Sequence, residues 1–312
     1  MTDSLRVAGV DCGTNSIRLL IVEVNPDGSL SEISRRNTIV RLGQGVDESG
    51  ELAPEAIERT RVALAGYVDE MVREGVKRVR MVATSAMRDV KNRDEFFAMT
   101  RALLSRVEVG KHADVISGAE EAKLSFAGAT ADLDPQRGPF CVIDLGGGST
   151  EFVTAQDAIS TRMGCVRLTE RFLQSDPPTE DETAQTRAYV RERLTQVASL
   201  IDASRTFIGC AGTFTTLSAL TQGLDMYEPQ RIHMSELPID ALRTTTRTLR
   251  KQTADERRAN PVIHPGRADV IAAGSLIVEE ILDLAESSGL QSVVISEKDI
   301  LDGIVASLLE GH

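Results

Sequence analysis

The sequence predicts a layered α/β protein made of two similar halves. Apolar segments of strand length alternate with segments of helical length along its 312 residues, which is typical of sheets covered by helices. The pattern apolar–Asp–x–Gly–x–x–Ser occurs twice, at Val10–Ser16 and at Ile143–Ser149. Each copy lies between two short apolar runs and therefore predicts strand, glycine turn and strand. This internal repeat indicates two related halves.

The elements of the first half follow from local patterns. Residues 5–24 predict a hairpin around the first copy of the motif, and residues 30–42 predict a further strand. Pro54 is expected to open a helix, because proline is favoured at the first helical position and an apolar face follows it. Residues 79–84 then predict the next strand, and residues 114–116 a short one before another helix.

The second half begins with the hairpin around the second motif copy. Thr179 and Glu182 have the spacing of a capping box, which predicts the start of a long helix. The polar, partly basic residues 229–260 predict solvated helical surface. Ser296 is expected to cap a terminal helix. Further elements are expected at 207–213 (a strand entering a glycine turn and a helix), 270–284 (a helix) and 293–295 (a strand).

Composition excludes several classes of protein. The formal net charge of −12 argues against a nucleic-acid binder or a protein of anionic membranes, either of which needs a basic face. No signal peptide, lipidation motif or long apolar span is recognisable, so we expect a cytoplasmic protein. The four cysteines form no CxxC pair and lie in apolar or glycine-rich segments, which predicts reduced core residues.

Both glycine turns have the composition of a phosphate-binding loop. Gly146–Gly148 lack Cβ atoms, so the backbone can turn sharply and bring its N–H groups close to an anion. Asp144 stands at the end of the preceding strand, where a carboxylate suits a magnesium ion bound to phosphate. The alternative is a tight hairpin in which the glycines serve geometry alone.

Two further features leave alternatives open. The turn at Gly209–Thr213 precedes a helix, so its N–H groups could hold phosphate or nucleoside, but close helix–strand packing explains the glycines equally well. Arg88 lies between a strand and a helix, where it could bind phosphate or simply pair with Asp89 at the surface.

The acidic doublet Glu120–Glu121 marks a candidate catalytic position. Ser117 and Glu120 have capping-box spacing, which gives Glu120 a structural task at the start of a helix. Glu121 has no such task and lies about 100° further round the helix. One carboxylate is therefore left for chemistry, although it could also simply complement the helix dipole.

Five motifs in one order carry a family resemblance, at residues 11–16, 83–88, 116–122, 143–151 and 209–213. With them the chain resembles the exopolyphosphatase/guanosine pentaphosphate phosphohydrolase (Ppx/GppA) family, a branch of the actin/Hsp70/sugar-kinase superfold. The resemblance implies two actin-like (ribonuclease H-like) domains with a phosphate-binding cleft between them. The first would comprise residues 1–120 plus 296–312, and the second residues 121–295. The chain resembles the short, two-domain type.

The resemblance also implies roles for individual residues. Glu121 matches the catalytic base of the family. Asp144 would hold Mg²⁺, with Mn²⁺ as the alternative ion, assisted by Glu151 and Asp11. The phosphate-binding positions implied, of which Arg18 is the less regular in the family, are Asp11, Gly13, Thr14, Asn15, Ser16, Arg18, Arg88, Gly146, Gly147, Gly148, Ser149, Gly212 and Thr213.

The activity implied is hydrolysis of a terminal phosphoanhydride, with inorganic polyphosphate or the guanosine alarmone pppGpp as substrate. The alternative is a nucleotide-binding sensor or ATPase of the same superfold without phosphatase activity, because fold and phosphate loops alone do not separate these functions. A homodimer is an expectation from the family only. Nucleic-acid and membrane partners are not expected.

Overall fold

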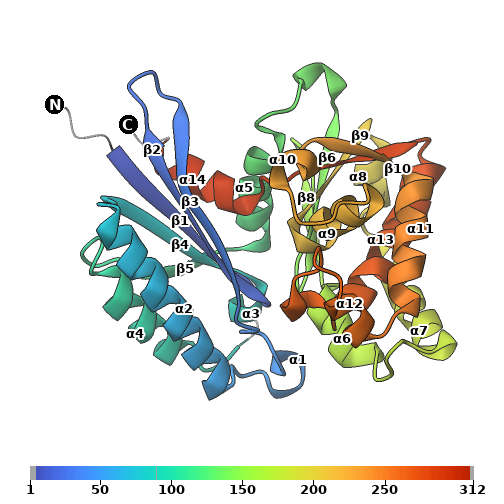
Figure 1. Ribbon diagram of the computed structural model, residues 1–312, viewed down its shortest axis with the longest axis horizontal. Coiled ribbons are helices and arrows are strands. Elements are labelled where there is room, and N and C mark those ends of the chain that lie inside the picture. The colour runs from blue at the N-terminus through green and yellow to red at the C-terminus, as the bar shows by residue number, and fades with distance from the viewer. Residues whose placement is uncertain (1–4, 89, 310–312) are drawn as a thin grey trace. The chain divides into compact units, whose positions relative to one another are not determined.

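The computed structural model describes residues 5–88 and 90–309. The chain forms two compact units, which Figure 1 shows as ribbons. One unit contains the residues up to Gly128 together with those from Ile300 onward, and the other contains Ala129–Asp299.

The unit boundaries lie a few residues beyond the expected positions of 120 and 296. The first falls later because Leu124 packs with Ile300 and Ile304 in one hydrophobic cluster, which ties its helix to the first unit. The second follows the start of the terminal helix α14 at Ile300. Ser296 was expected to cap that helix, and this is wrong. Its hydroxyl instead donates to the carbonyl of Lys298 and accepts from the Lys298 N–H.

The first unit is built on a five-stranded sheet of order β3-β2-β1-β4-β5. β1 and β2 form an antiparallel hairpin that β3 extends, whereas β4 and β5 run parallel to β1. The strands are β1 Leu5–Cys12, β2 Ser16–Val24, β3 Leu30–Ile39, β4 Arg78–Ala83 and β5 Ala113–Val115. The helices are α1 Val46–Ser49, α2 Pro54–Arg73, α3 Ser85–Arg88, α4 Arg93–Leu104, α5 Gly118–Thr130 and α14 Ile300–Leu309.

Helices cover both faces of this sheet. Because successive strand residues face opposite sides, Val10 of β1 packs in the cluster under α2 and α4, while Val7 packs against α14. Proline stands at the start of α2, as predicted, and the apolar face of that helix is buried. Two glycines allow α14 to pack closely. A Cβ on Gly9 would lie 3.0 Å from Val305 Cγ2, and one on Gly303 would lie 2.0 Å from the Leu124 carbonyl oxygen.

The second unit is built on a six-stranded sheet of order β10-β11-β9-β6-β7-β8. Its strands are β6 Phe140–Leu145, β7 Thr150–Val153, β8 Ala158–Thr161, β9 Thr206–Cys210, β10 Ser235–Pro238 and β11 Ser292–Ile295. Its α-helices are α6 Cys165–Phe172, α7 Glu180–Leu194, α8 Ala198–Asp202, α9 Ala211–Thr221, α10 Pro229–Ile232, α11 Ile239–Lys251, α12 Ala254–Arg258 and α13 Ile271–Ser287. Short 3-10 turns occur at Pro135–Arg137 and Pro265–Arg267.

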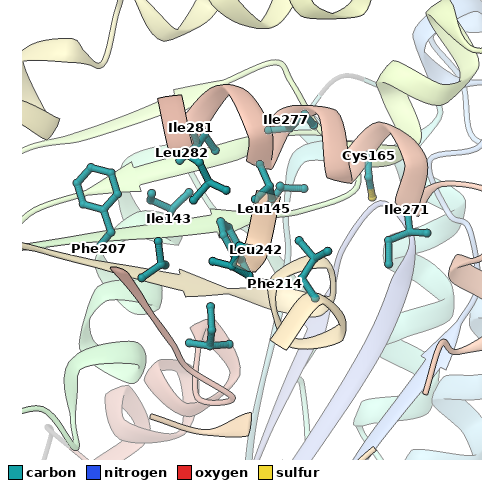
Figure 2. Packing of buried hydrophobic residues seen from close by; sticks show 14 of the residues in the cluster. Ile143, Leu145, Cys165, Phe207, Phe214, Leu242, Ile271, Ile277, Ile281 and Leu282 are labelled. Atoms are coloured by element: carbon teal, nitrogen blue, oxygen red, sulfur yellow. The ribbon is translucent and has the colours of Figure 1, made fainter. Parts of the chain in front are cut away.

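Aliphatic side chains from this sheet, α6, α9, α11 and α13 form the core of the second unit, and Figure 2 shows its centre. Ile143 and Phe207 of the sheet pack in one cluster with Ile277 and Ile281 of α13. The capping box at Thr179 is present as predicted.

The prediction of solvated helical surface for residues 229–260 is wrong in two places. The edge strand β10 forms within this stretch, and it pairs antiparallel with β11. Arg257 of α12 is 1% exposed and its Nη2 donates to Asp176 at 2.7 Å. Neither feature has a local signal, because each depends on a partner distant in the sequence.

The two units repeat one topology. The strand set β8-β7-β6-β9-β11 has the order and the strand directions of β3-β2-β1-β4-β5, and β10 is an addition at the edge. The hairpins carrying the two motif copies, β1–β2 and β6–β7, occupy equivalent places. The predicted α/β fold of two related halves is confirmed.

Candidate active site

The first glycine loop, Gly13–Asn15, connects β1 to β2. It is closed by a hydrogen bond from the Gly13 N–H to the Ser16 carbonyl at 2.9 Å. The carbonyls of Thr14 and Asn15 accept bonds from N–H groups of residues 40–43. The C=O and N–H of one trans peptide point in opposite directions. The N–H groups of Asn15 and Ser16 therefore point away from that supporting segment.

Asp11 and Arg18 are partners across the β1–β2 hairpin. The Arg18 Nη2 and Nε donate to Asp11 Oδ2 at 2.6 and 3.0 Å. Asp11 is 5% exposed, and a carboxylate buried to this extent requires a compensating charge. The structure therefore places a candidate phosphate ligand and a candidate metal ligand in one ion pair.

Glu121 lies in the first turn of α5, where Arg88 of α3 holds its carboxylate. The Arg88 Nη1 donates to Glu121 Oε2 at 2.6 Å and to the Ile116 carbonyl at 3.3 Å. The Glu121 side chain is 10% exposed and that of Arg88 24%. Asp89, the alternative partner of Arg88, lies outside the described residues. Both candidates are thus brought together in one largely buried ion pair.

Glu120, the other acid of the doublet, has a different environment. Its N–H donates to the Ser117 hydroxyl at 3.1 Å, which is the N-cap half of the expected box. Its carboxylate accepts a hydrogen bond from Arg80 at 2.5 Å and is 45% exposed. The first turn of α5 thus carries, at adjacent positions, a solvated acid with a structural task and a largely buried one.

The second glycine loop, Gly146–Gly148, connects β6 to β7. It is closed by the same bond as the first, from the Gly146 N–H to the Ser149 carbonyl at 3.0 Å. Ser149 is buried beside it. The loop carbonyls accept bonds from the first turn of α6, which begins at Cys165.

Asp144 and Glu151 are partners across the β6–β7 hairpin, at the positions that Asp11 and Arg18 occupy in the first hairpin. They are 7% and 1% exposed, and the Ser160 hydroxyl donates to Glu151 Oε1 at 2.7 Å. Like charges directly opposite each other in a sheet repel. The register position that holds Arg18 in the first hairpin holds the carboxylate of Glu151 in the second.

This pair fits Mg²⁺, which binds one or two carboxylates and takes its other ligands from water and phosphate. Within residues 5–88 and 90–309, no group of three or more His, Cys, Asp or Glu side chains is placed to hold a metal ion. An ion held by the two carboxylates would therefore complete its coordination from water and substrate.

The third glycine turn opens α9. A Cβ on Gly209 would lie 2.4 Å from the Phe214 ring, so close packing accounts for that glycine. A Cβ on Gly212 would lie 1.9 Å from Arg267 Nη1, which places a guanidinium against the start of the helix. Thr213 is buried behind it, in contact with Gly274.

Three residues near these loops were missed by sequence reasoning, namely Gly164, Arg167 and Arg267. The first two stand at the start of α6, directly behind the second loop. A glycine just before a helix, with an arginine three residues later, is a weak signal without a known partner. Arg267 follows a Pro–Gly turn and has no local signal for its position over Gly212.

The cysteines lie in the core of the protein. All four are free and buried, as predicted. Burial raises the pKa of the Cys165 thiol to about 11 and that of Cys141 to about 12, so neither is a thiolate at neutral pH. Across the described segments, every helix is too short or too polar to cross a bilayer.

Comparison with known proteins identifies the family. The model of the Ppx/GppA phosphatase family matches residues 20–312. The chain is 50% identical to exopolyphosphatase 2 of Mycobacterium tuberculosis, over 97% of this chain and 98% of that protein. It superposes on the crystal structure of the Aquifex aeolicus family member with a TM-score of 0.80 at 32% identity, covering 99% of both chains. For an exopolyphosphatase from Cytophaga hutchinsonii the TM-score is 0.88 at 25% identity, covering 98% of both chains. The chain therefore belongs to the Ppx/GppA phosphatase family.

Proposed function

We propose that this protein is an exopolyphosphatase that releases orthophosphate from the ends of inorganic polyphosphate in a Mg²⁺-dependent reaction. The observation that carries the proposal is the Asp144–Glu151 carboxylate pair beside a glycine loop, in a chain half identical to a protein named exopolyphosphatase 2. The alarmone pppGpp has the same terminal phosphoanhydride and is the second candidate substrate.

Glu121 is the proposed general base. Its carboxylate would orient a water molecule and take its proton as the water oxygen attacks the terminal phosphorus. The bridging P–O bond then breaks, and the shortened chain leaves with the bonding electrons as a stable phosphate. Because the leaving group is stable, a strong general acid is dispensable, and positioning and charge neutralisation supply most of the rate.

Arg88 has two tasks in this scheme. It fixes the direction of the Glu121 carboxylate through the bond at 2.6 Å. A guanidinium has five N–H donors in a planar fork, so the same side chain can also bind phosphate oxygens. Holding the base and the phosphate with one group would keep their separation constant during the reaction.

The glycine loops and the carboxylate pair would bind the phosphates. The N–H groups of Gly13–Ser16 and of Gly146–Ser149 are the proposed donors to phosphate oxygens, together with the start of α9 at Gly212 and Thr213. Asp144 and Glu151 would hold Mg²⁺ or Mn²⁺, which neutralises phosphate charge when bound. Asp11 is a weaker candidate for this role, because Arg18 already balances its charge.

The test is phosphate release, in the presence of Mg²⁺, from short polyphosphate, long polyphosphate, pppGpp and ATP. We expect release from polyphosphate, and a loss of about 10²–10⁴-fold in Glu121→Gln, which keeps the shape of the side chain but removes the base. Glu120→Gln is the matched control, because it changes the adjacent, exposed acid. Binding of these ligands by the native protein without release of phosphate would favour the sensor instead.

A further inference from the structure

The start of α6 supports the second glycine loop, and the proposed reaction gives this contact no role so far. Gly164 precedes α6, and a Cβ on it would lie 2.2 Å from the Gly147 carbonyl oxygen and 2.4 Å from Gly148 N. Those are backbone atoms, so a side chain at this position could be accommodated only by moving the loop. The start of α6 is therefore in direct contact with the Gly147–Gly148 peptide.

The first turn of α6 binds the loop carbonyls in sequence. The Cys165 N–H donates to the Gly146 carbonyl at 3.1 Å, and the N–H groups of Val166 and Arg167 donate to the Gly147 carbonyl at 2.9 and 3.1 Å. The first N–H groups of a helix have no partner within the helix. In α6 these N–H groups donate to the loop carbonyls. The start of this helix therefore supports the loop and is not itself an anion-binding site.

The side chain of Arg167 completes the support. Its Nε donates to the Gly148 carbonyl at 2.8 Å, and the residue is 8% exposed. The carbonyls of three successive glycines are thus bound from one side by α6. A bond from a charged donor contributes more than a neutral one. It also polarises the peptide it joins, which strengthens the N–H on the far side as a donor.

The orientation of the N–H groups follows from peptide geometry. The cis peptides among the described residues are Gly138–Pro139 and Asp176–Pro177, so the loop peptides are trans. In a trans peptide the N–H points opposite to the C=O. With the carbonyls of residues 146–148 directed at α6, the N–H groups of residues 147–149 are directed away from it. Successive N–H groups presented on one side form an anion-binding nest.

We infer that Arg167 is a positioning residue, which presets the N–H groups of Gly147, Gly148 and Ser149 for phosphate oxygens without touching the substrate. Gly164 contributes as well, because its lack of a side chain lets the start of α6 approach the loop closely. The first loop has a counterpart built from backbone bonds: N–H groups of residues 40–43 donate to its carbonyls, and a Cβ on Gly43 would lie 2.3 Å from Thr14 Cγ2. This inference rests on the proposed function for the identity of the ligand, and on the loop geometry for the rest.

The test compares Arg167→Gln with Arg171→Gln. Arg171 lies one turn further along α6 and stacks on Phe172 and Tyr189, with guanidinium-to-ring distances of 5.2 and 4.8 Å, so it is a matched loss of charge. In Arg167→Gln we expect KM for polyphosphate to rise roughly tenfold with kcat largely kept, because a charged hydrogen bond is lost. Arg171→Gln should match the native protein, and Arg167→Lys, which keeps the charge, should recover part of the loss.

A second readout needs no ligand. Amide hydrogen exchange at residues 165–167 reports the bonds between α6 and the loop, and we expect it to be roughly tenfold faster in Arg167→Gln. Exchange in α13 should be unchanged, which separates local undocking from general destabilisation. Native KM, or native exchange at 165–167, in Arg167→Gln would overturn the inference. If the native protein neither binds nor hydrolyses polyphosphate, the proposed function fails, and exchange still decides the role of Arg167.

Discussion

The facing carboxylates of the second hairpin predict that Mg²⁺ stabilises the fold itself. The perturbation is Glu151→Gln, which removes one of two like charges that are 7% and 1% exposed. The amide has nearly the same shape, and its oxygen can still accept the hydrogen bond from Ser160. The change therefore removes one of the two charges while keeping the side-chain shape and the bond from Ser160.

The magnitude follows from the register of the hairpin. Residues directly opposite in antiparallel strands have Cβ atoms about 5 Å apart. Two unit charges at that separation, with an effective dielectric constant of about 20, repel by about 3 kcal/mol, which is an upper value because the carboxylates can turn apart. Removing the repulsion should raise the Tm of the metal-free protein by several degrees.

The assay is thermal unfolding in EDTA and across a Mg²⁺ titration. The native Tm should rise with Mg²⁺, because an ion that binds only the folded state stabilises it by mass action. Glu151→Gln should start higher and respond weakly. Asp157→Asn, an exposed acid in the turn after β7, is the control for net charge. The reasoning is refuted if Glu151→Gln lowers the metal-free Tm, or if its Mg²⁺ response equals that of the native protein.

Three further predictions concern stability. Gly303→Ala should lower the urea midpoint by an amount equivalent to about 1–3 kcal/mol, because its Cβ would overlap the Leu124 carbonyl. Ala211→Gly should raise the urea midpoint by an amount equivalent to roughly 1 kcal/mol, because Ala211 has a left-handed φ of 65°. Hydrogen bonds, first from the Thr179 N–H, lower the pKa of Glu182 from 4.5 to about 2. The contribution of the Glu182 carboxylate to the stability of the fold is therefore complete above pH 4.5 and is lost as the pH falls through 2. In acid denaturation, Glu182→Gln should show a shallower loss of stability across that range.

Elements with local signals were predictable from the sequence. The two hairpins, the helix at Pro54 and the capping box at Thr179 each depend on residues within a few positions of one another. Strand β10 was missed because it exists through its pairing with β11, more than fifty residues later. Ser296 was misread because a serine before a helical pattern resembles a cap whether or not the helix starts there.

For the candidate site, the sequence indicated which residues to consider, but not the partners that the fold gives them. Glycines, acids and hydroxyls stand out in the sequence because their chemistry suits a tight turn, an anion or a metal ion. Arg88 bonds to Glu121, which is thirty-three positions away in the sequence. This contact depends on how β4, α3 and α5 fold together. Arg18 and Glu151 can both be read in the sequence after the two motif copies. Only the register of the two hairpins shows that they occupy equivalent positions, opposite Asp11 and Asp144.

The packing of α14 on the first sheet has a consequence for synthesis on the ribosome. Leu301, Val305 and Leu308 cover one face of the hairpin β1–β2, yet they are made after all of Ala129–Asp299. At a synthesis rate of about 5–20 residues per second, making that segment takes roughly ten to thirty seconds, and the apolar face stays uncovered during that time. Of the two units, the second is the one whose segments emerge without interruption. It should therefore be the first to complete its core, while the apolar face of the β1–β2 hairpin in the first unit stays exposed until α14 has been made.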